Sequence, residues 1–469
     1  MNKKKLAINI LYAFAAQGLS MALSVLMSLI VPKMLGVEQF SYWQLFIFYS
    51  GYVGMFHFGL TDGVYLKLGG KASDKIDKKE LSSMFWILFY LQIVISILAI
   101  LVALLFGMSA NRSFSLIATC VYMIIANLTW FLGYILQAVN NTKQFSISTI
   151  LSKISFILFL VILLFRKVQD FRWFVITFII SQAISFIYTS LVSKKILKEK
   201  PSISLKTFYT AYSYARVGIK LTIANTSSIF ILGIGRFFID GNWGIIEFGK
   251  ISFAISLAMF FLQFIGQVSM VLFPALRTID DEKQKGYFTL IEKGLSIVLP
   301  AILVLYIPMK LILSKWLPQY NDSLDYLGLL LPICIFDGKM NMLFSTYLKV
   351  IRREGKLLLF NFVAVLVSLV SVFFSAILLH NISFVALSLL ISIATRSLIA
   401  QKYLFKYYGI PYIKNAITEI VIVLYYLLSI FYLNDQTAFV MLLTGYVMLI
   451  ILSRNTIFSL FRSGKNRSD

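Results

Sequence analysis

Seven of the 43 basic residues lie within long apolar stretches, where a charge is costly unless it meets water or a partner. A lysine or arginine at the centre of a membrane helix costs about 2.5–3.5 kcal/mol, whereas one near a helix end reaches the interface for much less. Lys250 and Arg396 lie near the expected ends of their stretches, so we expect them to reach the interface. The others are candidates to line an aqueous path that binds substrate: Lys153, Arg216, Lys220, Arg236 and Lys339.

Arg216 and Lys220 are four residues apart, which places them on one face of a helix. Arg236 falls on the opposite face of the same stretch unless Gly233 and Gly235 bend it inward. Basic side chains of this kind suit an anionic cargo, because a guanidinium group binds phosphate through two parallel hydrogen bonds. They would repel cationic drugs. The charge of the interior therefore favours a phosphorylated substrate.

Acidic residues within the apolar stretches are fewer than the basic ones. Asp337 and Lys339 are two residues apart and so do not face each other on a helix, which means that each needs a partner on another helix. An intramembrane carboxylate is also a candidate for coupling transport to an ion gradient. The candidates for ion coupling are Asp62, Asp337 and Glu419.

No catalytic motif accompanies these charges, so we do not expect an enzyme. A phosphate-binding loop, a dinucleotide-binding glycine loop and a zinc-protease motif are missing from the sequence. Cys120 and Cys334 both lie in apolar stretches, so we expect no metal site, and nothing in the sequence calls for a cofactor. For His57 we favour a hydrogen-bonded interior residue over a pH sensor.

The elements that position these residues are about fourteen apolar stretches, each long enough to cross a hydrocarbon core about 30 Å thick. Hydrophobic residues make up 59% of the chain and charged residues 13%, and the mean hydropathy is +0.85. This predicts an all-α polytopic membrane protein. The predicted spans are 7–31, 40–66, 82–106, 114–138, 145–165, 173–193, 213–238, 245–273, 288–313, 324–348, 357–379, 382–401, 415–433 and 437–453.

Lysine and arginine alternate between the polar seams that separate these spans, with 29 in one set of seams and 7 in the other. Because basic residues mark the cytoplasmic side, both termini are predicted to be cytoplasmic in a multi-pass protein of the inner, or cytoplasmic, membrane. The seam at 165–172 fits poorly, because it is basic but falls on the external side. Basic residues spread over alternate seams also exclude a nucleic-acid partner.

The longest basic seam surrounds Pro201 and predicts a linker that lies on anionic lipid. A faint repeat supports a division there, because the segment from Leu35 to Trp43 resembles the segment from Asp240 to Lys250. The predicted domains are a six-helix lobe at 1–193, a cytoplasmic linker at 194–212, a second six-helix lobe at 213–404, and two further helices with a basic tail at 405–469.

The run from His57 to Gly70, with sequence HFGLTDGVYLKLGG, resembles the end of the second span in bacterial polysaccharide flippases. These belong to the multidrug/oligosaccharidyl-lipid/polysaccharide exporter superfamily. The resemblance implies two six-helix lobes around a cationic cavity and two extra helices that form a hydrophobic groove. It implies an undecaprenyl-diphosphate-linked oligosaccharide as cargo, moved outward for O-antigen or capsule assembly alongside a polymerase and glycosyltransferases. By position, Arg216, Lys220 and Arg236 match the basic residues of that family's cavity.

Two other functions remain open at this point. One is an exporter of small molecules or drugs that is driven by Na⁺ or H⁺ and uses the candidate ion-coupling acids. The other is a membrane glycosyltransferase or polymerase, which would need convergent catalytic groups on a sizeable loop. The longest seams carry lysines instead, so the enzyme is the least favoured of the three.

Overall fold

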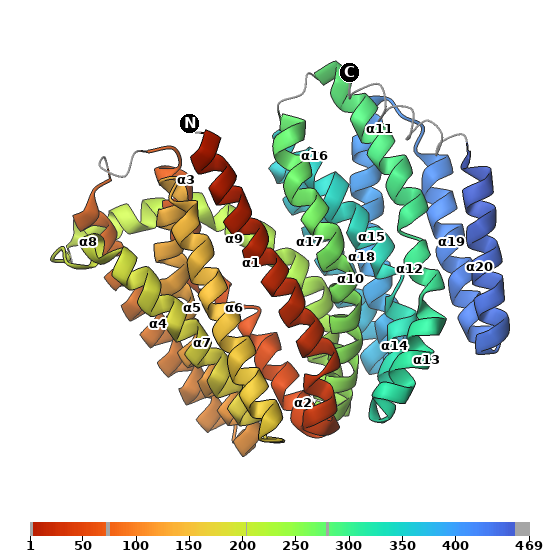
Figure 1. Cartoon of the computed structure of the whole chain (residues 1–469), viewed down its shortest axis with the longest axis horizontal. Coiled ribbons are helices and arrows are strands. Elements are labelled where there is room, and N and C mark those ends of the chain that lie inside the picture. Colours follow the sequence, from red (N-terminus) through yellow and green to blue (C-terminus); the bar gives the residue numbers. More distant parts are fainter. Residues whose placement is uncertain (1–2, 72–75, 203, 278–280, 455–469) are drawn as a thin grey trace. The chain divides into compact units, whose positions relative to one another are not determined.

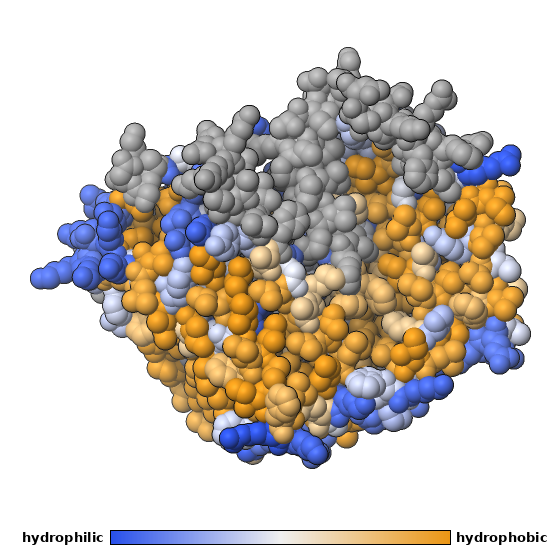
Figure 2. Space-filling view, in the orientation of Figure 1, coloured by the Kyte–Doolittle hydropathy of each residue, from blue (hydrophilic) through white to orange (hydrophobic). Residues whose placement is uncertain are grey.

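The computed structural model describes residues 3–71, 76–202, 204–277 and 281–454, and within these ranges it contains helices and no strands (Figure 1). The predicted all-α polytopic membrane fold is confirmed. Ten helices in the described residues are long and apolar enough to cross a membrane, and counting each of three bent helix pairs as one span raises the number to thirteen. Apolar side chains cover the flanks of these helices in Figure 2, and hydrophilic residues gather at helix ends.

The sequence predicted a short polar seam between the spans 7–31 and 40–66. In the structure, Ala15–Leu29 and Val31–His57 form one of the bent pairs, with an angle of 68° between them. Gly36 interrupts the second of these helices with a φ of 68°, a backbone conformation that glycine adopts without steric cost. The chain therefore turns within a helical segment, where the sequence suggested a loop.

The chain divides by its internal contacts into two compact units, Met1–Ile229 and Phe230–Asp469. The first unit contains nine helical elements and the start of a tenth. They are α1 (Lys3–Leu29), α2 (Val31–Ser50), η1 (Val53–His57), α3 (Leu60–Leu68), α4 (Lys78–Leu105), α5 (Ala110–Ala138), α6 (Thr142–Phe165), α7 (Phe171–Val192), α8 (Lys194–Leu197) and the first part of α9 (Leu205–Trp243).

The second unit begins within α9 and contains the elements that follow it. They are α10 (Ile245–Arg277), α11 (Asp281–Val298), α12 (Ala301–Val304), α13 (Tyr306–Trp316), η2 (Pro318–Tyr320), α14 (Asn321–Leu330), α15 (Ile333–Lys339), η3 (Met340–Phe344), α16 (Ser345–Val350), α17 (Glu354–Phe373), η4 (Phe374–Leu378), α18 (Ile382–Tyr408), α19 (Ile413–Tyr432) and α20 (Asp435–Leu452). Of these, η3 and η4 are π-helical segments.

Helix α5 lies at the centre of the first unit and contacts α2, α3, α4, α6 and α7. Its buried side chains join an apolar core that includes Leu88 on α4 and Phe131 on α5. A second, aromatic layer surrounds Trp43, which is 1% exposed and lies 5.9 Å from the ring of Phe178 and 6.3 Å from that of Phe156. Aromatic burial of this size stabilises the packing of α2 on α6 and α7.

Glycines bring α9 into direct backbone contact with α3. A Cβ atom on Gly218 would lie 2.0 Å from the carbonyl oxygen of Gly59, and one on Gly63 would lie 2.0 Å from that of Tyr214. Because of this contact, the start of α9 belongs to the first unit. The division at Ile229 therefore falls later in the chain than the linker expected at 194–212.

Candidate functional site

Two buried charge networks share α15 in the second unit. Lys339, the last residue of α15, has a fully buried side chain. Its ammonium nitrogen lies 2.6 Å from Oε1 of Glu419 on α19 and 3.1 Å from Oε1 of Glu292 on α11. It also donates a hydrogen bond of 2.5 Å to Ser296. The two glutamate side chains are only 3% and 4% exposed, so this is an ionic cluster inside the helical packing.

Asp337 faces a different partner. Its carboxylate forms an ion pair with Arg396 on α18, and both residues are buried. Arg396 also reaches Asn361 on α17, and Asn341 donates a hydrogen bond of 3.0 Å to Asp337. The expectation that Asp337 and Lys339 need partners on other helices is confirmed.

The expectation that Arg396 reaches the membrane interface is wrong. The predicted span ended at 401, which put Arg396 near a helix end, but α18 continues to Tyr408. Arg396 is consequently 3% exposed and is held inside the unit by Asp337. The sequence suggested that Lys339 lines an aqueous path. In the structure its side chain is buried, and two carboxylates compensate its charge.

A cavity of about 570 Å³ lies against the Lys339 cluster, by which we mean Glu292, Ser296, Lys339, Gln401, Asn415 and Glu419. It is bounded by polar residues from α11 and α19, among them the exposed side chains of Lys293 and Lys414. Both lysines belong to seams that carry the cytoplasmic charge pattern. The cavity therefore presents positive charge at its mouth and carboxylates deeper inside.

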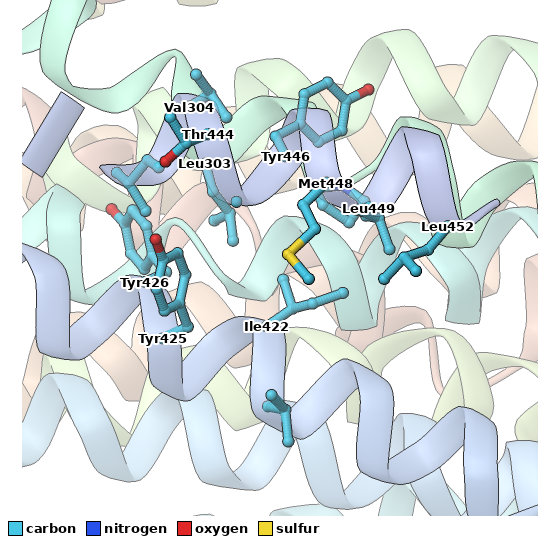
Figure 3. Close-up of a pocket in the computed structure, with 14 residues that line it drawn as sticks. Leu303, Val304, Ile422, Tyr425, Tyr426, Thr444, Tyr446, Met448, Leu449 and Leu452 are labelled. Carbon is cyan, nitrogen blue, oxygen red and sulfur yellow. The ribbon is translucent and has the colours of Figure 1, made fainter. Parts of the chain in front are cut away.

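A second cavity, of about 380 Å³, is an apolar groove formed by α12, α19 and α20 (Figure 3). It shares Pro300, Ile422, Leu449 and Leu452 with the polar cavity, so the two cavities are neighbours. Its other lining residues are almost all apolar or aromatic, including Leu303, Tyr425, Tyr426 and Met448. The second unit therefore places a cavity with charged lining residues beside an apolar groove.

The first unit holds three intramembrane cations with no hydrogen-bond or ion-pair partner among the described residues: Lys153, Arg216 and Lys220. Lys153 is half-buried on α6. Arg216 and Lys220 are exposed. The glycine contact with α3 fixes the rotation of α9, so both point away from the face that packs on α3. Arg236, on the part of α9 in the second unit, is half-buried and has an interaction partner.

Asp62 is buried at the start of α3, close to a histidine and a threonine. Thr222 on α9 donates a hydrogen bond to Oδ2 of Asp62, and Nε2 of His57 lies 3.9 Å from the same oxygen. Nδ1 of His57 accepts a hydrogen bond of 3.1 Å from the backbone of Gly59. The expected interior position of His57 is found, and the structure joins it to one of the candidate ion-coupling acids.

The sequence indicated Asp62, Asp337 and Glu419 as candidate functional acids, but it did not indicate Glu292 or Gln401. Glu292 lies near the start of the predicted span 288–313, and Gln401 closes the predicted span 382–401. In the structure, Gln401 donates a hydrogen bond of 2.7 Å to Glu419, and Glu292 contacts Lys339. The sequence did contain a signal for Glu292, because Glu292 and Ser296 are four residues apart and therefore lie on one helix face.

No protein-family model matches the sequence, and no curated protein matches it. Three solved structures resemble the fold. A lipid II flippase, MurJ, in an inward closed conformation is 16% identical, with a TM-score of 0.68, covering 96% of this chain and 100% of the flippase. An inward-facing multidrug resistance MATE transporter of the MOP superfamily is 13% identical, with a TM-score of 0.58, covering 82% and 94% of the two chains. A MATE structure in the straight conformation is 13% identical, with a TM-score of 0.54, covering 86% and 95%. The chain thus shares its fold with these three structures.

Proposed function

We propose that this protein is a flippase that moves an undecaprenyl-diphosphate-linked oligosaccharide from the cytoplasmic to the outer leaflet for assembly of a surface polysaccharide such as O-antigen or capsule. The protein would work in the inner membrane with both termini in the cytoplasm. A polymerase and glycosyltransferases of the same process would supply and consume its substrate. The proposal rests on charge, on an apolar groove and on the fold.

The observation that carries the proposal is the set of unpartnered cations in the first unit. A lysine or arginine within a membrane span is retained at a cost when it binds something in a hydrated path. Arg216 and Lys220 lie one helical turn apart and are exposed on the same face of α9. Two cations at this spacing suit a diphosphate, which carries several acceptor oxygens close together. Lys153 adds a third positive charge in the same unit.

The groove along α19 and α20 supports a lipid substrate. A polyprenyl chain can lie against the apolar residues of this groove and bury its hydrocarbon there, while the oligosaccharide crosses through water. The MurJ structure named a lipid II flippase shares the fold over nearly the whole chain. At 16% identity this likeness supports the class of transport and leaves the glycan undefined.

The test is a double variant, Arg216→Ala with Lys220→Ala, assayed for surface glycan in cells that depend on this protein. A hydrogen bond to a charged group contributes about 1.5–3 kcal/mol, so losing two should lower transport at least about tenfold. Membrane level and thermal stability should not change, since both side chains are exposed.

The matched control is Lys310→Ala, which removes a partly exposed cation that pairs with Asp325 and Asp435. We expect normal glycan from this control. Normal glycan from the double variant would contradict the proposed binding role of Arg216 and Lys220.

An ion-driven exporter is the second candidate, and the buried Asp62 beside His57 and Thr222 favours it. The two functions differ in cargo. Deletion cells that become sensitive to cationic drugs and keep their surface glycan would support the exporter and contradict the flippase.

A further inference from the structure

The Lys339 cluster contains one more negative charge than positive. Glu292 and Glu419 contribute two carboxylates, and Lys339 contributes the single ammonium that contacts both. All three side chains are at least nine-tenths buried. An uncompensated charge in such a place costs several kcal/mol, so a group of this kind tends to bind a counter-charge or a proton.

The hydrogen bonds show which oxygen lacks a donor. Oε1 of Glu292 accepts from Lys339 and Ser296, and its Oε2 accepts from Asn415 at 3.3 Å. Oε1 of Glu419 accepts from Lys339 and Gln401. Oε2 of Glu419 is buried and has no hydrogen-bond partner in the described part of the chain.

Gln401 gives an independent observation at the same place. Its side chain is fully buried, and its amide nitrogen is directed at Glu419. Its oxygen, Oε1, is also buried without a donor among the described residues. Two acceptors without a donor, beside an excess negative charge, leave room for a hydrogen that would satisfy the cluster.

Several other charged or titratable groups lie on the helices around the cluster. Lys293 on α11 and Lys414 on α19 bound the neighbouring cavity and are exposed. Tyr412 precedes α19, and burial together with the charge of Glu419 raises the pKa of its hydroxyl. On α15 and α18, Asp337 and Arg396 neutralise each other. Leu449 and Leu452 of α20, and Ser453, which follows this helix, also line the cavity and are uncharged.

A proton fits this site better than a metal ion. The ammonium of Lys339 lies within hydrogen-bond distance of both carboxylates and would repel a second cation between them. Within the described residues, no group of three or more acidic, histidine or cysteine side chains could hold a metal ion. One proton is enough to make the cluster neutral.

We propose that the Glu292–Lys339–Glu419 cluster is a proton-binding site in which Oε2 of Glu419 is the atom that takes up the proton. The proton enters from the cavity that both glutamates line. The cluster joins α19 to α11, α15 and α18, and Ile422 of the apolar groove lies one turn further along α19. Proton binding therefore changes the charge that holds α19 next to the groove. This site is separate from the cations proposed to bind the diphosphate.

The test counts protonated carboxyl groups by infrared titration of the full-length protein in membranes, following the C=O stretch of the buried acid. The charge balance of the cluster predicts how many protonated carboxyl groups the unsubstituted protein and each variant contain. The unsubstituted protein should hold one proton in the cluster. Glu419→Gln and Glu292→Gln should each lose that signal at neutral pH, because the remaining carboxylate pairs with Lys339. Lys339→Met should gain a second protonated carboxyl, since two buried carboxylates then lack a cation.

Glu354→Gln is the matched control, because Glu354 is an exposed carboxylate in the first turn of α17. It should leave the signal unchanged. A carboxyl signal that persists in both glutamine variants, or the lack of one in the unsubstituted protein at neutral pH, would overturn the proposal. If Glu419→Gln fails to fold, Glu292→Gln decides the question, since it keeps Glu419 and must still lose the proton. The titration does not depend on the transported lipid, so it can succeed or fail independently of the flippase assay.

Discussion

Asp337 and Lys339 are separated by one residue on α15, yet their charges are neutralised from different sides of the second unit. Asp337 pairs with Arg396 on α18, whereas Lys339 contacts Glu292 on α11 and Glu419 on α19. Within three residues the chain ties four helices together by charge. The π-helical segment η3 starts at the next residue, Met340. π-Helical turns inside helices are frequent at functional sites, and this one begins where the two charge networks meet.

Breaking the buried Asp337–Arg396 ion pair should lower the free energy of unfolding by more than the small surface area of these two side chains suggests. Asp337→Leu leaves the guanidinium of Arg396 buried without its carboxylate, so we expect the free energy of unfolding to fall by about 3–5 kcal/mol. Adding Arg396→Met should recover most of the loss, because an apolar pair of similar size has no charge to compensate. Denaturation of the purified protein in detergent measures both variants. Equal stability of the single and double variants would count against a buried pair.

The glycine contact between α3 and α9 makes a second prediction. A methyl group at position 63 would lie 2.0 Å from the carbonyl oxygen of Tyr214, so Gly63→Ala must push the two backbones apart. We expect a loss of about 1–3 kcal/mol or more in unfolding free energy. Gly18→Ala is the control, because Gly18 lies in α1 with nothing within 4 Å of the added Cβ. That control should be neutral or stabilising by up to about 1 kcal/mol. Thermal unfolding that does not distinguish the two variants would rule out the close contact.

The features that the sequence predicted correctly are those that depend on local spacing. Hydropathy identified the helical segments, since a membrane helix must be apolar over its lipid-facing length. The spacing of Asp337 and Lys339 correctly excluded a mutual ion pair. The four-residue separation of Arg216 and Lys220 likewise placed them on one face, as found.

Helix length beyond the apolar stretch could not be read in the same way. Helix α18 runs to Tyr408 and α11 begins at Asp281, so each carries extra polar turns outside its predicted span. Gln401 and Glu292 lie inside the predicted spans, close to these extra turns, and face inward to the Lys339 cluster. Hydropathy reports contact with lipid, and inward-facing polar residues at the ends of helices give no such signal. Arg396 was expected near the interface because α18 extends beyond its predicted span.

Thr222 should hold Asp62 in place. Thr222→Val keeps the side-chain shape but removes the hydroxyl that donates to Asp62, which leaves a buried carboxylate oxygen without that donor. We expect a loss of about 1–3 kcal/mol in unfolding free energy. Thr226→Val is the control one turn further along α9, since Thr226 donates only to the backbone carbonyl of Thr222. Chemical denaturation at neutral pH compares the two. A larger effect at 226 than at 222 would contradict the role of the hydroxyl.

The apolar groove makes the last prediction, which concerns the lipid chain. Leu449 lies where the groove meets the polar cavity, so Leu449→Trp should fill the space that a polyprenyl chain would occupy. Burying each methylene contributes about 0.8 kcal/mol, so displacing a few isoprene units should lower transport of a long-chain substrate at least about tenfold. The same variant should transport a short-chain analogue as well as the unsubstituted protein does. Ile451→Trp is the matched control on α20, because Ile451 is 59% exposed and does not line the groove. Reconstituted vesicles with substrates of two chain lengths measure both variants, and an equal loss for long and short chains would show that the groove does not bind the tail.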